Sequence, residues 1–359
     1  MRFGIIVGTR PNFVKASAVI RALAARNVKP VLIHTGQHHD ASLSQAFFDR
    51  LSLPPPDHHL GVSAGGRGAQ LGVTIEKLSA LLPTLKLDEL IVVGDVTSTA
   101  AGALAADACD LKVSHVEAGL RSFDDTMPEE RNRKVVDAIA HRLFASEPSG
   151  VKNLLAEGHP ASQVHLVGNV MIDTLLRFKE QAIADQPWAR HGLERGKYFI
   201  ATLHRPGNVD ARESFDEAMA VLAECAKAGP VLFAMHPRTT ARVQQWGLEL
   251  PKGVRACPPL DYLEFIGLMA GAKAVLTDSG GAQEETTVLQ VPCLTLRENT
   301  ERPVTLTQGS SRLIGRSLEK AKQALAELAA GSFPLGGAIE GWDGKAGARI
   351  ADVLLGAAK

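Results

Sequence analysis

The stretch TDSGGAQEE, residues 277–285, indicates the fold class of this chain. An apolar run, Ala274 to Leu276, precedes it and predicts a buried strand, and residues 286–289 (TTVL) predict a helix. A strand therefore ends, the chain turns through Gly280 and Gly281, and a helix begins. The first amides of a helix lack internal partners and carry the positive end of its dipole, and glycines let a ligand approach closely. This turn predicts a phosphate site with Ser279 as an added donor. A strand–helix turn that binds no ligand would have the same sequence pattern.

A charged segment follows the next strand-like run. Residues 297–303 (RENTERP) come directly after the run from Val291 to Leu296. Ligands of open α/β sheets bind at the carboxyl ends of parallel strands, and Arg302 is able to clamp a diphosphate through two hydrogen bonds. Glu284 and Glu285 lie one helical turn beyond the glycines, where a carboxylate can hold a ribose or a second anchor.

Strand-like and helix-length runs alternate over most of the chain, which predicts βαβ units and doubly wound parallel sheets. The pattern restarts near residues 168–173, so we expect an N-terminal domain over residues 1–170 and a C-terminal domain over residues 171–344. A final helix at about residues 345–359 is expected to pack back on the first domain. The Pro- and Gly-rich segment from Pro54 to Gly68 predicts a mobile surface loop. The expected strands are 5–7, 31–34, 90–93, 113–116, 164–167, 198–202, 231–235, 274–276 and 291–296, and the expected helices are 13–25, 41–51, 99–108, 128–141, 173–186 and 345–355.

Composition excludes several classes of function. The 359 residues include 39 basic and 39 acidic side chains, and this zero net charge argues against a nucleic-acid or membrane-surface partner. A hydrophobic fraction of 45% with 5% aromatic residues indicates an aliphatic α/β core. No run of about 18 apolar residues predicts a membrane span, and four scattered cysteines favour a reducing cytoplasm. Neither a metal-ligand spacing nor a dinucleotide glycine motif is present, so we expect no metal and no nicotinamide cofactor.

Charged residues also follow the expected strands of the first domain. Arg10 and Lys15 come after the first strand, where they either meet an anionic substrate or are merely solvated. Asp95 follows the third strand and is either a helix N-cap or a catalytic group. Strand alternation predicts that His115 and Glu117 share one side of the sheet.

A helix is expected to begin near Pro128, with Thr126 and Glu129 forming a capping box. Glu130 then has no structural role in the cap. If Asp95, Glu117 and Glu130 converge in one crevice, each raises the pKa of the others, which would keep one as an acid and one as a base near neutral pH.

Two histidines end strands of the second domain. His204 and His236 both follow strand-like runs and are expected to face the same cleft as the phosphate-type turn. A lone histidine at a strand end is more often structural, but two beside such a turn favour function, with His204 the better candidate.

With these residues in place, the chain resembles the non-hydrolysing UDP-N-acetylglucosamine 2-epimerases over nearly its whole length. The matching blocks are GTRPNFVK, HTGQHHD, VVGDVTST, HVEAGLRSFDDTMPEERNR, VGNVMIDTL, TLHRP, HPRT, TDSGGAQEE and RENTERP. The resemblance implies two Rossmann-like domains, as in GT-B glycosyltransferases, with the active site in the interdomain cleft and a homodimer as the usual assembly.

The resemblance also implies roles for individual residues. It implies that UDP is held by Ser279, Gly280, Gly281, Glu285 and Arg302, with Arg10 reaching across and His204 near the diphosphate. It implies that Asp95, Glu117 and Glu130 are the catalytic acids, and Lys15, Arg133 and His236 are further substrate-binding candidates.

The implied reaction is reversible inversion at C2 of UDP-N-acetylglucosamine, giving UDP-N-acetylmannosamine through a glycal, without metal or nicotinamide. Three alternatives stay open: a GT-B glycosyltransferase, a hydrolysing 2-epimerase and a non-catalytic UDP-sugar sensor. The sequence leaves open the C3 and C6 substituents of the sugar and which carboxylate is the acid.

The chain departs from the family's pattern where bacterial members bind an activating second substrate. Asp40 stands where a neutral amide is often found, and Pro206 and Gly207 replace an Arg-Glu pair. Proline and glycine offer no side-chain donor or acceptor to a second sugar nucleotide, and Asp40 would repel its diphosphate, so we expect weak or absent activation by substrate.

Overall fold

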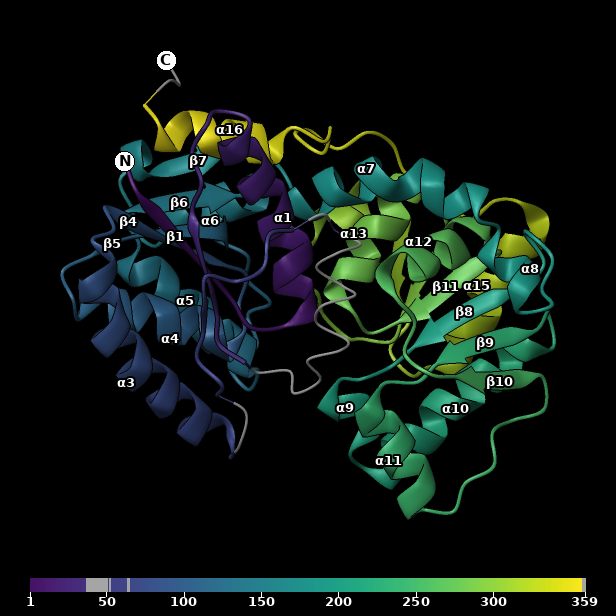
Figure 1. Cartoon of the computed structure of the whole chain (residues 1–359). Helices are drawn as coiled ribbons and strands as arrows, with labels where there is room; N and C mark the ends of the chain where they lie inside the picture. The colour runs from purple at the N-terminus through teal and green to yellow at the C-terminus, as the bar shows by residue number, and fades with distance from the viewer. Residues whose placement is uncertain (37–50, 52, 63–64, 357–359) are drawn as a thin grey trace. The chain divides into compact units, whose positions relative to one another are not determined.

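The computed structural model describes residues 1–36, 51, 53–62 and 65–356, and the chain divides into two compact units (Figure 1). Unit 1 comprises Met1–Thr174 and Glu340–Lys359, and unit 2 comprises Leu175–Ile339. The helix expected over residues 41–51 and the segment that holds Asp40 lie almost wholly outside the described residues. Among the described residues, no helix is both long and apolar enough to cross a membrane.

Unit 1 contains a parallel sheet of seven described strands in the order β3-β2-β1-β4-β5-β6-β7. The order reverses direction between β1 and β4, the switch point at which ligands bind open α/β sheets. The strands are β1 Phe3–Val7, β2 Val31–His34, β3 His58–His59, β4 Glu89–Val93, β5 Lys112–Ala118, β6 Arg142–Ala145 and β7 Val164–Leu166. The helices are α1 Arg10–Ala24, α3 Arg67–Leu85, α4 Thr97–Asp107, α5 Pro128–Ile139, α6 Pro148–Ala156 and α16 Ala346–Leu354, with a 3-10 turn η1 Ala161–Gln163.

Unit 2 repeats this architecture with six described strands in the order β10-β9-β8-β11-β12-β13, all parallel. Its switch point lies between β8 and β11. The strands are β8 Phe199–Thr202, β9 Val231–Ala234, β10 Val254–Cys257, β11 Ala274–Thr277, β12 Cys293–Thr295 and β13 Ser311–Leu313. The helices are α8 Pro187–Arg190, α9 Pro206–Val209, α10 Arg212–Ala226, α11 Pro237–Gln245, α12 Tyr262–Gly271, α13 Gly280–Leu289, α14 Val304–Thr307 and α15 Leu318–Ala330; α7 Val170–Ala184 crosses the unit boundary.

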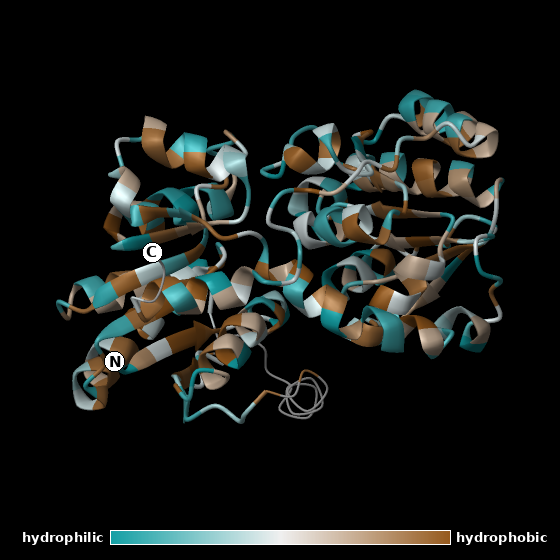
Figure 2. Cartoon of the chain, turned by 90° about the horizontal axis from the view of Figure 1, so that it is seen from above, coloured by the Kyte–Doolittle hydropathy of each residue, from teal (hydrophilic) through white to brown (hydrophobic). Residues whose placement is uncertain are grey.

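Most central strands are buried along their full length because helices cover both faces of each sheet. Every residue of β1, β4 and β11 is buried, and the strand residues are largely hydrophobic, whereas the helices alternate between polar and apolar positions (Figure 2). Helix α4, with the sequence TSTAAGALAAD, is rich in alanine and lies close to the sheet. A Cβ added at its Gly102 would stand 2.6 Å from Ile6 Cδ1. This close packing fixes the β4–α4 turn, which carries Asp95.

Several elements were not expected from the sequence. The segment expected to be a loop, Pro54 to Gly68, contributes the short strand β3 and the start of α3. Strands β6, β10 and β13 were also missed. They are short, and β6 (RLFA) carries a charged residue, so they give no period-2 signal of useful length. The C-terminal helix α16 packs against α1, where Arg26 Nε donates to Asp352 Oδ1 at 2.9 Å.

Candidate active site

The candidate residues gather at the carboxyl ends of the strands within each unit. In unit 1, Arg10 opens α1 after β1, Asp95 follows β4, and Glu117 lies near the end of β5. In unit 2, the segments after β8, β9, β11 and β12 carry the two histidines, Ser279 and the RENTERP segment. Each unit therefore presents its polar residues at the edge where doubly wound sheets bind ligands.

Asp95 is not a helix N-cap. Helix α4 begins at Thr97 with Val96 in the N-cap position, and no side chain caps it. The Asp95 carboxylate instead forms an ion pair with Arg133 and keeps 22% of its side chain exposed. Its backbone carbonyl accepts a hydrogen bond from Asn132 Nδ2 at 2.7 Å. Helix α5 thus holds both the backbone and the carboxylate of Asp95, leaving the side chain partly accessible.

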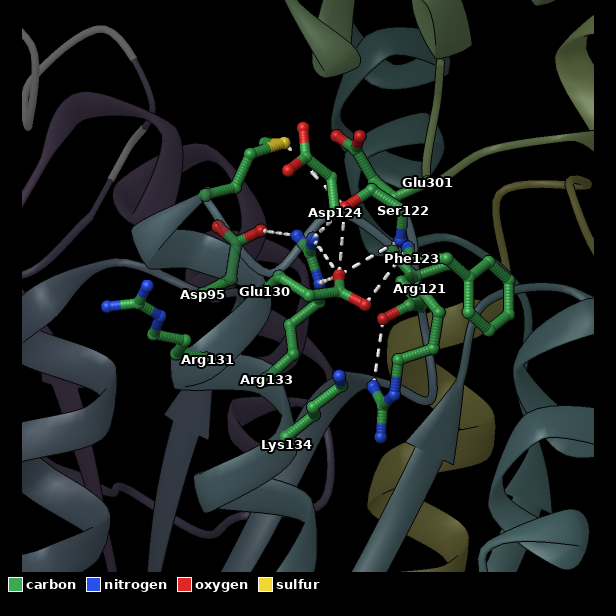
Figure 3. A network of polar contacts seen from close by, with 12 residues as sticks. Asp95, Arg121, Ser122, Phe123, Asp124, Glu130, Arg131, Arg133, Lys134 and Glu301 are labelled. Carbon is green, nitrogen blue, oxygen red and sulfur yellow. Dashed lines mark hydrogen bonds and ion pairs between the residues drawn. The ribbon is translucent and has the colours of Figure 1, made fainter.

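Glu130 is fully buried, and its two oxygens are surrounded by donors (Figure 3). The amide of Ser122 donates at 2.9 Å, the Ser122 hydroxyl at 3.0 Å, and the amide of Phe123 at 3.1 Å. Arg133 adds Nε at 3.1 Å and Nη2 at 2.5 Å. Burial by itself raises the pKa of Glu130, but the Ser122 amide and Arg133 outweigh it, so the pKa is lowered from its usual value.

Two expectations about this segment are wrong. Helix α5 begins at Pro128 with Met127 as the N-cap residue, and Thr126 Oγ1 contacts Asp124 Oδ1 at 2.5 Å, so Thr126 and Glu129 form no capping box. The pKa of Glu130 is lowered instead of raised, because the Arg133 cation and two backbone amides donate to its carboxylate. Arg133, a candidate substrate ligand, is 1% exposed and lies between Asp95 and Glu130.

Glu117 forms a buried ion pair with Lys15, whose Nζ lies 2.5 Å from Glu117 Oε2. Lys15 is therefore not a solvated surface charge. Glu117 has a left-handed backbone, with φ of 72°, and the register of β5 shifts beside it. The alternation that predicted a shared side with His115 is broken at this point: Glu117 contacts α1, whereas His115 contacts Asp137 of α5.

The phosphate-type turn of unit 2 differs in one detail from the sequence expectation. Helix α13 already begins at Gly280, with Ser279 in the N-cap position. The two glycines therefore belong to the first turn of the helix and not to the loop that connects β11 to it. A Cβ at Gly280 would stand 2.4 Å from Arg302 Nη1. Arg302 lies directly against the start of the helix, so a larger residue at position 280 would have to displace its guanidinium group.

Three arginines and two glutamates, Arg205, Arg297, Arg302, Glu284 and Glu301, form what we call the arginine–carboxylate cluster. Arg302 contacts Glu284 through Nε and Glu301 through Nη1. Glu301 also receives Arg297 Nη2 at 2.6 Å and Arg205 Nη2 at 3.4 Å. Burial raises the pKa of Glu301, yet the three arginines hold it well below its usual value. The cluster places three guanidinium groups beside the N-terminus of α13, with one more cation than carboxylate.

His204 is tied to a buried aspartate that the sequence did not single out. Its Nδ1 lies 2.9 Å from Asp278 Oδ1, and Asp278 also accepts the amides of His204 and Arg205 and Nδ2 of Asn208. His236 has a structural task, because its Nδ1 caps α11 by accepting from the Arg238 amide at 3.2 Å. The two rings are 5.8 Å apart between centroids, so the histidines do lie together.

Asp278 is expected to make the unfolding free energy of unit 2 decrease at low pH. Burial raises its pKa, but His204 and the surrounding donors lower it from 3.8 to about 2. A depressed folded-state pKa adds stability above pH 4 that disappears as pH falls through 2, and this shift is worth about 2 kcal/mol. Asp278→Asn should therefore lose about 2 kcal/mol of urea-unfolding free energy at pH 6 and little at pH 2. Asp185→Asn, an exposed change in the same unit, should match wild type, and a pH-independent deficit in Asp278→Asn would contradict the assignment.

The remaining candidates are placed as follows. Arg10 is half-buried, Ser279 and Gly281 are partly exposed, and Glu285 is buried in α13. Sequence reasoning did not single out Arg205, Arg297, Glu301 or Asp278 as site residues. All four lie within the quoted motifs, but only distances reveal which of their charges meet.

The fold and these clusters define a class of protein. Two doubly wound parallel sheets with charged strand ends are the architecture of GT-B-like α/β proteins. A family model described as UDP-N-acetylglucosamine 2-epimerase matches residues 21–355, and the chain belongs to this family.

Relatives agree with this membership. A UDP-N-acetylglucosamine 2-epimerase of Methanocaldococcus jannaschii is 38% identical, covering 90% of this chain and 91% of its own. A crystal structure of the M. jannaschii enzyme in complex with UDP-GlcNAc and UDP superposes with a TM-score of 0.90 at 36% identity, covering 99% of both chains. A UDP-2,3-diacetamido-2,3-dideoxy-D-glucuronate 2-epimerase of Pseudomonas aeruginosa is 35% identical over 99% of both chains.

Proposed function

We propose that this protein interconverts UDP-N-acetylglucosamine and UDP-N-acetylmannosamine by eliminating and re-adding UDP through a glycal. The observation that carries the proposal is the pair of carboxylates Asp95 and Glu117, each at a strand end of unit 1 and each ion-paired with a cation. Family membership over residues 21–355 supplies the substrate class.

In the proposed reaction a carboxylate removes the C2 proton, and the C–H electron pair forms the C1–C2 double bond. The bond from C1 to the UDP oxygen breaks, and UDP leaves with its electron pair. A proton then returns to C2 from the opposite face, and UDP re-adds to C1. The C2 proton is weakly acidic, so the base must be well placed, and the leaving diphosphate needs donors where its charge develops.

We assign the two parts of this chemistry to different residues. Proton transfer falls to Asp95 and Glu117, with Lys15 and Arg133 as their cations. Glu130 is enclosed by donors, and we assign it to holding Arg133 and the Ser122–Phe123 segment in position. UDP binding falls to the α13 N-terminus at Ser279, Gly280 and Gly281, and to Glu285, Arg302, His204 and Arg10.

Incubation in deuterated water tests the proposal. Recovered UDP-N-acetylglucosamine and UDP-N-acetylmannosamine should both carry deuterium at C2, because the proton that returns comes from solvent. Proton NMR distinguishes the other functions: free N-acetylmannosamine plus UDP indicates a hydrolysing enzyme, and binding without any turnover indicates a sensor. Folded protein that binds UDP yet incorporates no deuterium would exclude proton abstraction.

The substituents at C3 and C6 of the sugar, the assembly as a homodimer and the location in the cytoplasm stay predictions. The 2,3-diacetamido relative shows that the family includes substrates with other C3 and C6 groups. Tests of turnover should therefore include such a sugar nucleotide beside UDP-N-acetylglucosamine. Assembly as a homodimer and location in the cytoplasm follow from the family resemblance and from composition.

A further inference from the structure

His115 is a fully buried histidine of β5, and both of its ring nitrogens face an acceptor. Nε2 lies 2.8 Å from the carbonyl oxygen of Gly94, and Nδ1 lies 2.6 Å from Asp137 Oδ1. A carbonyl oxygen only accepts hydrogen bonds, so Nε2 must carry a hydrogen. The contact with Gly94 therefore fixes the ring as a donor toward the β4–α4 turn.

Asp137 is held as a carboxylate on the other side of the ring. Burial raises its pKa, but His115 and Arg121 outweigh burial, and the pKa is lowered. Asp137 Oδ2 accepts the Gly119 amide at 3.1 Å and lies 2.7 Å from Arg121 Nη2, and Arg121 in turn pairs with Glu157 at 2.6 Å. The short contact of Asp137 Oδ1 with Nδ1 therefore holds the side of the ring opposite to Gly94.

This chain of contacts ends at the peptide that carries Asp95. Gly94 has a φ of 70°, its amide donates to the Val116 carbonyl at 2.9 Å, and its own carbonyl receives His115. Both hydrogen-bonding groups of Gly94 are thus fixed by β5, one residue before Asp95. Helix α5 fixes Asp95 itself through Arg133 and Asn132.

We propose that His115 is a positioning residue for Asp95, acting through its Nε2–H bond to the Gly94 carbonyl. The inference rests on the proposed role of Asp95 in proton transfer. Asp95 must hold its carboxylate within a few tenths of an ångström of the productive position, and such support from residues behind a catalytic group is commonly worth about 10- to 100-fold in activity.

Two nearly isosteric variants separate the two bonds of the ring. The amide nitrogen of Gln reaches the position of Nε2, so His115→Gln keeps the donor to Gly94 and loses the bond to Asp137. The amide nitrogen of Asn reaches the position of Nδ1, so His115→Asn keeps the bond to Asp137 and loses the donor to Gly94. We expect His115→Asn to lower kcat by about 10- to 100-fold and His115→Gln by about 5-fold or less. KM and the Kd for UDP should stay near wild type in both.

The melting temperature provides the readout that separates positioning from packing. Both variants lose one buried bond and should lose similar stability, so a purely structural role predicts equal losses of kcat. Equal losses, or a change in KM in place of kcat, would overturn the inference. Equal losses of kcat in the two His115 variants overturn the role of His115 alone, provided that wild type turns over and Asp95→Asn does not. A wild type without epimerase activity overturns the proposed function.

A spectroscopic measurement covers variants that do not fold. In wild type labelled with 15N-histidine, the buried Nε2–H of His115 should give a slowly exchanging N–H signal. Absence of any slowly exchanging histidine Nε2–H signal would contradict the donor arrangement of His115.

Discussion

Asp95→Asn is expected to lower kcat by about 10²- to 10⁴-fold, the usual worth of a positioned acid or base. The amide keeps the size of the side chain and still accepts a hydrogen bond from Arg133, but it cannot take a proton. The Kd for UDP should change little, because Asp95 is not among the residues assigned to UDP binding. Steady-state kinetics in both directions and calorimetric titration with UDP measure the two effects.

Asp110→Asn is the matched control for this variant. Asp110 is an exposed aspartate of unit 1 with a φ of 53°, a conformation that asparagine tolerates well. It should keep wild-type kcat. Near-normal turnover in Asp95→Asn, or an equal loss in both variants, would show that Asp95 does not transfer the proton.

Arg302→Ala should weaken UDP binding by about 10- to 150-fold, which corresponds to about 1.5–3 kcal/mol for a lost charged hydrogen bond. It should also destabilise the folded state by about 3–5 kcal/mol, because Glu284 and Glu301 lose their shared buried cation. Calorimetric titration with UDP and urea unfolding measure the two losses separately.

Arg302→Lys and Arg195→Ala sharpen this test. Lysine keeps the charge but cannot contact Glu284 and Glu301 in the planar arrangement of a guanidinium, so we expect an intermediate UDP affinity. Arg195 is an exposed arginine of unit 2 that precedes β8, at the edge opposite Ser279, and its loss should leave UDP affinity unchanged. UDP affinity that survives Arg302→Ala would remove Arg302 from the binding site.

The sequence predicted the strands of the two sheets better than it predicted which charged side chains pair with each other. Runs such as Leu90 to Val93 and Ala274 to Leu276 are continuous and apolar, since both faces of their strands are buried. Short strands such as β10 carry charge on an exposed edge and give no such signal. The α13 turn was located, although Gly280 belongs to the helix and not to the turn.

Site residues could be listed from the sequence, but their charges could not be paired. Glu130 was expected to meet other carboxylates, and it meets Arg133 and two amides that lie 7–8 residues earlier in the chain. Asp278 and His115 look like ordinary strand-end and strand residues until distances show Asp278 bonded to His204 and His115 to the Gly94 carbonyl. Such pairings depend on side-chain direction across neighbouring elements, which residue spacing does not encode.

The docking of α16 on α1 has a consequence for the order in which a ribosome-bound chain can fold. Asp173 accepts the amides of Ala346 and Gly347, and α1 meets α16 more than 300 residues further along the chain. All of unit 2 is synthesised before the last helix of unit 1 leaves the exit tunnel. During that interval the part of α1 at Ala18, whose carbonyl lies against Gly347 of α16, lacks its cover. We therefore expect the second unit to complete its native contacts before the first unit does.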